Sequence, residues 1–172
     1  MTRILGIDPG SQVTGYGIID VVGNYNHYHI SGCIHTPTGR PLADRLKTIF
    51  ESLGQIIALH QPEEMAVEQV FLHRNPDSAL KLGQARGVAI CAGAIAELRI
   101  SEYTPRIIKQ AVAGNGGAGK AQIQYMVCAL LKLQHPPPQT DAADALAVAL
   151  CHGHTMQTLS RLGKSRVRGR GR

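Results

Sequence analysis

Short apolar segments separated by glycine-containing turns occupy the first part of the chain, up to about residue 35. They predict three β-strands, at residues 3–8, 14–22 and 25–34, the last of which alternates apolar and polar positions. The turn PGSQ separates the first two segments, and Gly23 and Asn24 separate the second from the third. Because such short connections join antiparallel neighbours, this part of the chain predicts an antiparallel meander.

Helical spacing of apolar positions replaces this pattern after residue 40. A helix is predicted over 41–60, with Pro62 ending it, and a short buried strand over 65–70 contains one acid. The remaining predicted elements are a helix at 77–98, a strand at 100–105, and helices at 106–113, 119–133 and 140–152. Strands that come first as hairpins and then alternate with helices predict an α/β fold, in which helices flank a mixed sheet.

The composition is that of one globular domain. The chain has 172 residues, 44% of them hydrophobic and 17% charged, which is enough to bury a core. No apolar run approaches the roughly 18 residues of a membrane span, and the start, MTRILGIDPG, lacks the pattern of a secretion signal. Widely spaced cysteines favour buried thiols over a disulfide framework; they are Cys33, Cys91, Cys128 and Cys151. We therefore expect a cytoplasmic protein that does not enter membranes.

The end of the chain carries all of its net charge. Six basic residues and no acid lie between positions 161 and 172, and without them residues 1–160 contain equal numbers of bases and acids. The whole net charge of +6 therefore belongs to this end. We expect one folded domain over 1–155 and a basic, disordered tail over 156–172 that is attracted to a polyanion. A merely solvated end is the alternative.

Four acids occupy positions where a carboxylate is costly. Asp8 and Glu68 interrupt apolar strands, and Asp141 and Asp144 lie three residues apart at a helix start, on one helix face. The last two could instead stabilise the N-terminus of the helix, Asp141 as its N-cap and Asp144 as an acid of its first turn. Taken together, however, four such acids without flanking bases favour a divalent-cation site, because an unpaired buried carboxylate costs several kcal/mol. Magnesium suits carboxylate oxygens, and two such ions can activate water and stabilise the leaving oxygen of a phosphodiester.

Four motifs in fixed order make the chain similar to a known family. GIDPGSQVTGYGIID, AVEQVF, NPDSALKLGQARGVAI and TDAADALAVAL resemble the RuvC family of Holliday junction resolvases, over about residues 3–152. The resemblance implies a ribonuclease-H-like fold with a five-stranded mixed sheet, a homodimer, and paired symmetric nicking of four-way DNA junctions in recombination and repair. It further implies Mg²⁺ as cofactor, two ions per site with Mn²⁺ as a substitute, and association with the RuvA and RuvB branch-migration complex.

The same resemblance assigns roles to individual residues. The family's catalytic and metal-binding acids correspond to Asp8, Glu68, Asp141 and Asp144, and its DNA-binding residues to Phe71, Lys109 and Lys120. Without the family, a core ring is the favoured interpretation of Phe71, and an exposed ring that stacks on an unpaired base is the alternative. Gly114 to Lys120 matches the phosphate-binding pattern GxxxxGK, but Ala121 replaces the required Ser or Thr and a predicted helix precedes it. A flexible loop that brings Lys120 to a DNA phosphate is therefore the better interpretation.

The predicted helix over 77–98 contains a strip of small residues: Gly83, Gly87, Ala92, Gly93 and Ala96. Such a strip allows close helix approach across a dimer interface, although it also suits packing on the sheet. Because a four-way junction has two-fold symmetry and paired nicks need two sites, an isologous dimer is expected.

Two histidine groups have no evident role in the sequence. The segment CHGHT at 151–155 lacks a second ligand pair for zinc and is expected to end the last helix. His27 and His29 share a strand face without evident partners.

Two other functions stay open, an actin-like phosphotransfer ATPase and a non-catalytic DNA-binding module. The first needs a second domain, and the second leaves the four acids unexplained.

Overall fold

The computed structural model describes residues 1–37, 39–70 and 76–168, with side chains up to residue 162. Its elements follow the predicted order. They are β1 (Thr2–Asp8), β2 (Val13–Val22), β3 (Tyr25–His35), α1 (Leu42–His60), β4 (Glu64–Glu68), α2 (Pro76–Ile95), β5 (Arg99–Tyr103), α3 (Pro105–Ala113), α4 (Lys120–Leu131) and α5 (Thr140–Arg168).

The five strands form one mixed sheet in the order β3-β2-β1-β4-β5. β1 pairs antiparallel with β2, and β2 with β3, which confirms the predicted meander. β4 runs parallel to β1 and to β5; α1 leads from β3 into β4, and α2 connects β4 to β5. The carboxyl ends of β1 and β4 therefore lie side by side at one edge of the sheet.

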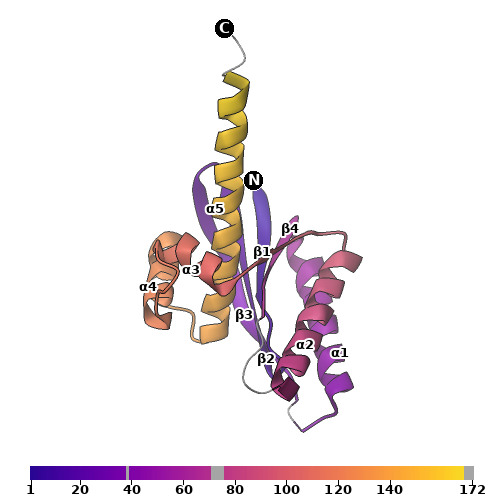
Figure 1. Ribbon diagram of the computed structural model, residues 1–172. Helices are drawn as coiled ribbons and strands as arrows, with labels where there is room; N and C mark the ends of the chain where they lie inside the picture. Colours follow the sequence, from indigo (N-terminus) through magenta and orange to yellow (C-terminus); the bar gives the residue numbers. More distant parts are fainter. Residues whose placement is uncertain (38, 71–75, 169–172) are drawn as a thin grey trace.

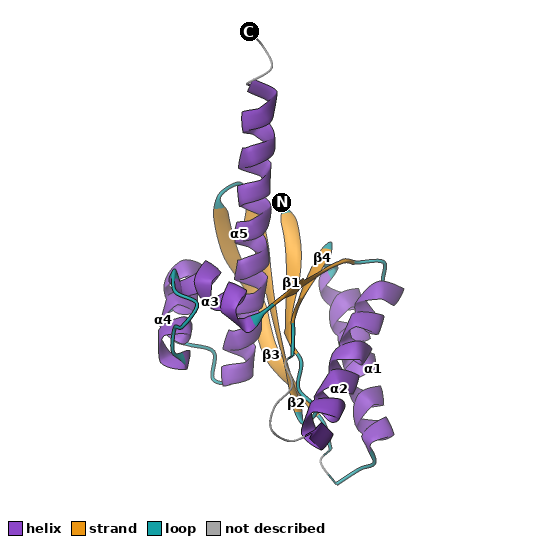
Figure 2. Ribbon diagram, in the orientation of Figure 1, coloured by secondary structure: helices purple, strands orange, loops and turns teal. Residues whose placement is uncertain are grey.

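Helices cover both faces of this sheet. Figures 1 and 2 show α1 and α2 on one side and α3, α4 and α5 on the other. Consecutive strand residues point to opposite layers: Ile4 packs among residues of α3 to α5, whereas Leu5 packs among residues of α1 and α2. Because both faces of the central strands β1 and β4 are buried, these two strands appear in the sequence as apolar runs.

Glycines in β1 and β2 let α5 lie directly on the sheet backbone. Gly6 pairs with Gly17 across the two strands. A Cβ at Gly6 would overlap the carbonyl oxygen of Ala145, and one at Gly17 would lie 2.8 Å from the Leu146 side chain. This close approach positions the first turns of α5, and the acids that they carry, against the end of β1.

The last helix differs most from the sequence prediction. It was expected to end near residue 152 and a disordered tail to begin at 156, but α5 continues to Arg168 (Figure 1). Once a helix is nucleated by packing, adding residues costs little, so the segment beyond 152 extends it although it would be a poor helix alone. Gly153 lies within this helix, where it packs closely against Val21 and Asn26. The expected boundary at residue 155 thus falls inside a helix.

In the part of the chain that the structure describes, no helix combines the length and apolar character needed to cross a lipid bilayer.

Candidate active site

Three of the four acids line one pocket at the carboxyl edge of the sheet. Asp8 is the last residue of β1 and Glu68 the last of β4, and these strands are parallel neighbours. Asp144, in the second turn of α5, lines the same pocket of about 230 Å³. Strand order and the glycine-mediated approach of α5 together bring these three carboxyl groups close.

Asp141 lies at the side of this pocket. Its backbone packs on Gly15, which pairs with Asp8 across β1 and β2, and a Cβ at Gly15 would lie 2.5 Å from the Asp141 carbonyl carbon. The charge of Asp141 helps raise the pKa of Asp8. Cys33, on the next strand, is half-buried close to Asp141; burial raises its thiol pKa, and so does this acid. The sequence did not indicate Cys33, because only strand register reveals that it is a neighbour.

The electrostatics of the site disfavour full ionisation. Burial raises the pKa of Asp8 to about 8, and the charges of Glu68, Asp144 and Asp141 add to that effect. The pKa of Glu68 is raised by burial and then by Asp144. Without a bound cation, the group of acids therefore retains a proton near neutral pH.

Two lysines supply positive charge to the same pocket. Lys120, the first residue of α4, places its Nζ 2.9 Å from Oδ2 of Asp144, and this contact raises the pKa of the lysine. Lys109 of α3 also lines the pocket and lowers the pKa of Glu68. Asp144 is thus paired, which its sequence neighbours did not indicate.

The donor set suits a hard divalent cation. Carboxylate oxygens that repel one another, with a raised pKa at Asp8 and Glu68, are the groups that such an ion would bind and neutralise. Among the described residues, no three His, Cys, Asp or Glu side chains are yet arranged as metal ligands. The cation beside Asp144 is instead the Lys120 ammonium group.

Other predicted residues are separated by the structure. Phe71 lies outside the described residues. Ala92 is buried, and a Cβ at Gly93 would meet the sulfur of Met65, so this half of the small-residue strip packs on the sheet. Gly83 and Gly87 instead have open space at the Cβ position.

The cysteines are less buried than predicted. All four are free thiols, but only Cys151 is buried, whereas Cys91 is exposed on α2. None of the four forms a disulfide.

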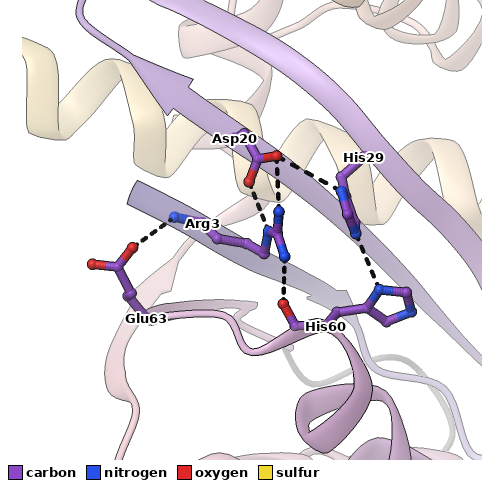
Figure 3. A network of polar contacts seen from close by, with 5 residues as sticks. All are labelled: Arg3, Asp20, His29, His60 and Glu63. Atoms are coloured by element: carbon purple, nitrogen blue, oxygen red, sulfur yellow. Dashed lines mark hydrogen bonds and ion pairs between the residues drawn. The ribbon is translucent and has the colours of Figure 1, made fainter. Parts of the chain in front are cut away.

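The histidines have partners that the sequence did not reveal. His152 lies within α5 instead of ending it, and it is buried against Glu64 and Tyr103. The one sequence feature that could have indicated this contact is the acid Glu64 at the start of the apolar strand β4. His29 contacts His60 through Nε2 and Nδ1, 3.1 Å apart (Figure 3).

The contacts of His29 belong to a network at the opposite end of the strands from Asp8. Arg3 of β1 donates from Nε to Asp20 of β2 over 2.7 Å and from Nη1 to the His60 carbonyl, also over 2.7 Å (Figure 3). Nδ1 of His29 is 3.7 Å from Asp20. The pKa of Asp20 is lowered, mainly by the hydrogen bond from Arg3. This network joins β1, β2, β3 and the end of α1.

Comparison with known proteins identifies relatives over nearly the whole chain. The family described as crossover junction endodeoxyribonuclease RuvC matches residues 4–152. Proteins of that name are 56% identical over 100% of this chain in Idiomarina loihiensis and 54% identical over 96% of it in Alkalilimnicola ehrlichii, and each match covers 99% of the relative. The solved structure of Thermus thermophilus RuvC in complex with Holliday junction substrate has a TM-score of 0.87 and 31% identity, covering 92% of this chain and 96% of that one.

Proposed function

The chain belongs to the RuvC family of crossover junction endodeoxyribonucleases, and on this premise we propose that its acidic pocket cuts DNA at four-way junctions. The family has a ribonuclease-H-like fold, and the five-stranded mixed sheet agrees with it. The observation that carries the proposal is the pocket itself, in which three acids and two lysines converge. The premise does not favour a phosphotransfer ATPase or a non-catalytic module.

The proposed chemistry is hydrolysis of a phosphodiester with Mg²⁺ as cofactor, two ions per site, and Mn²⁺ as a substitute. Asp8, Glu68, Asp141 and Asp144 would hold the ions, which supply an activated water and stabilise the leaving oxygen. Asp8 would give up its proton when a cation is bound, because the charge of the ion would offset the burial and the neighbouring acids that raise its pKa. Lys120 and Lys109 bind the DNA phosphate and stabilise the negative charge that develops on it.

One incubation tests this function directly. The protein is mixed with a four-way junction and Mg²⁺ in the absence of nucleotide, and the products are separated on a denaturing gel. Symmetric paired nicks are expected. Junction retention without cutting would indicate a binding module, and hydrolysis of added ATP would indicate a phosphotransferase.

Phe71 and Lys120 are expected to fail differently when they are replaced. A ring that stacks on a base released at the crossover contributes roughly 1 to 3 kcal/mol. Phe71→Ala should therefore cut an intact junction slowly but recover on a junction with unpaired bases at its centre. Lys120→Ala lacks a cation in the pocket, which a pre-opened junction cannot replace, so both substrates should be cut slowly.

The measurement is a two-by-two comparison of cutting rates at saturating enzyme, with intact and pre-opened junctions. If Phe71→Ala were equally defective on both substrates and also melted at a lower temperature, Phe71 would be a core residue. If Lys120→Ala recovered on the pre-opened junction, it would act on junction opening rather than on charge.

Two copies of the chain are proposed to associate through the exposed face of α2. Leu80 and Ile95 on this helix are 68% and 71% exposed, and Gly83 and Gly87 between them leave room for close approach. Leu80, Gly83, Gly87, Cys91 and Ile95 follow helical spacing, so they form one face. This face replaces the strip predicted from the sequence, half of which is buried.

Gly87→Glu is expected to convert the dimer to a monomer, because it places a charge at the centre of this face. Gly54→Glu is the matched control, since Gly54 is an exposed glycine of α1 with nothing near its Cβ position. Light scattering at micromolar concentration measures the mass of each variant. A wild-type monomer that still made paired nicks would contradict the dimer.

The basic end of the chain is proposed to add non-specific DNA affinity. Residues 161–168 belong to α5, so deleting them would shorten the helix. The test variant therefore replaces the six basic residues by glutamine, which preserves the helix. The slope of log affinity against log salt should become shallower by about 0.9 for each DNA phosphate that the variant no longer neutralises. Cutting at saturating enzyme should not change. An unchanged slope would instead assign this segment to a protein partner, of which RuvA and RuvB are the proposed ones. We also propose that the protein acts in the cytoplasm, because its proposed substrate is a four-way DNA junction.

A further inference from the structure

A buried polar chain joins α5 to β4 and β5. His152 of α5 is only 4% exposed, and its Nε2 lies 2.6 Å from Oε2 of Glu64, which is 8% exposed. Its Nδ1 lies 2.7 Å from the hydroxyl of Tyr103. In the neutral ring, Nε2–H donates to the carboxylate and Nδ1 accepts from the phenol, so both nitrogens have partners. Nη1 of Arg99 lies 3.5 Å from the other oxygen of Glu64.

One member of this chain also holds the strand end that carries Glu68. Tyr103 is the partner of Glu68 in the β4–β5 register, and its carbonyl accepts a 2.8 Å hydrogen bond from the amide of Gln69. Its phenol contacts His152 of α5. Tyr103 therefore connects the strand that positions Glu68 to the helix that positions Asp144.

The helix transmits the position of His152 to the active site. His152 follows Asp144 by eight residues, which is about 12 Å along a helix axis. The contacts of α5 with β1 involve small residues such as Gly6 and Ala145, which allow close approach but make no directional side-chain bonds. The two hydrogen bonds of His152 are directional, and so they resist sliding of α5 along the sheet.

We propose that His152, Tyr103 and Glu64 form a positioning device that sets the separation of Asp144 from Glu68. None of the three lines the acidic pocket, so they act through the carboxylates and not on the DNA. The inference rests on the proposed function of that pocket. Metal-assisted hydrolysis needs its ligands held within a fraction of an ångström, and partners behind the ligands commonly supply that constraint.

Tyr103→Phe is the most conservative test, because it removes one hydroxyl and leaves the ring. His152→Gln retains a donor and an acceptor. Single-turnover cutting by Tyr103→Phe should fall by about 10-fold, and its affinity for Mn²⁺ alone, measured by calorimetry without DNA, should fall by a similar factor. Junction affinity should stay within about twofold, since every group that binds a phosphate is retained. His152→Gln should lose less than His152→Leu in both assays.

Asp20→Asn provides a control for loss of stability. It breaks the partly buried ion pair with Arg3 at the far end of the strands, shown in Figure 3, where the side chain of Asp20 is paired with Arg3 of β1 and His29 of β3. All variants are assayed well below their melting temperatures. Asp20→Asn should melt at a lower temperature and yet retain the cutting rate and the Mn²⁺ affinity of the unaltered protein.

The positioning device would be overturned if Tyr103→Phe and His152→Leu kept both the cutting rate and the Mn²⁺ affinity while melting at lower temperatures, as Asp20→Asn does. Failure of the proposed function gives a different result. In that case Asp8→Asn would bind Mn²⁺ and cut junctions like the unaltered protein, whatever the result for Tyr103→Phe.

Discussion

Asp8→Asn is expected to abolish junction cutting while junction binding is retained. An amide oxygen is a much weaker ligand than a carboxylate for a divalent cation, and the loss of several kcal/mol of metal-assisted stabilisation lowers the rate by about three orders of magnitude or more. Binding should stay equal or improve, because the change removes a negative charge near the DNA phosphates. Glu68→Gln, Asp141→Asn and Asp144→Asn should behave alike. Asp44→Asn, an exposed acid of α1, is the matched control.

The same substitution should stabilise the metal-free protein at alkaline pH. The pKa of Asp8 is about 8 in the folded chain, against an ordinary value of 3.8, so between these values the folded state binds more protons than the unfolded one. In the metal-free protein, the contribution of Asp8 to the free energy of unfolding is therefore greatest below about pH 4. It declines as the pH rises and is lost once the pH passes about 8. Asp8→Asn removes this decline, which amounts to several kcal/mol.

Calorimetric melting in chelator at pH 5 and pH 8.5 measures this effect. The melting temperature of Asp8→Asn should exceed that of the unaltered protein at pH 8.5, and Mg²⁺ should raise the melting temperature of the unaltered protein much more than that of the variant. If the variant melted at the same temperature or lower at pH 8.5, the acids would not repel one another as the geometry indicates. If any of the four variants cut at a near-normal rate, that residue would not belong to the site.

Gly6→Ala is expected to be one of the most destabilising single methyl additions to the sheet, together with Gly15→Ala. The new Cβ would overlap the carbonyl oxygen of Ala145, and it would lie 2.6 Å from the amide nitrogen of Ala149. Both obstacles are backbone atoms of α5, so the helix itself would have to move away from β1. We expect a loss of about 3 kcal/mol or more in the free energy of unfolding.

Two other glycines provide a graded comparison in urea titrations. Gly93→Ala meets the flexible end of the Met65 side chain, which can yield, and so it should cost less. Gly54→Ala lies in the open on α1 and should stabilise the protein by about 0.5 to 1 kcal/mol through helix propensity. If Gly6→Ala does not accumulate in soluble form while the other two do, the order still holds. Equal stability of Gly6→Ala and Gly93→Ala would contradict the close packing of α5.

Much of the fold was predictable from local patterns. The spacing of apolar residues alone predicted ten elements in the observed order, because strands buried on two faces and amphipathic helices have different periods. The candidate acids were also recognisable, since Asp8 and Glu68 interrupt apolar strands and such positions are costly without a purpose. The motifs around them gave the family, which the comparisons confirm.

Tertiary structure alone decided how these parts meet. Strand order places Asp8 beside Glu68, and residues far apart in the chain, Lys120 and Asp144, form an ion pair that no local pattern indicates. The burial of His152 against Glu64 depends on where α5 crosses the sheet, across 88 positions of sequence. The length of α5 depends on its packing, because tertiary contacts, more than propensity, stabilise helices in proteins. Periodicity is a property of neighbours along the chain, whereas registry between elements depends on contacts that form only when the sheet and its helices assemble.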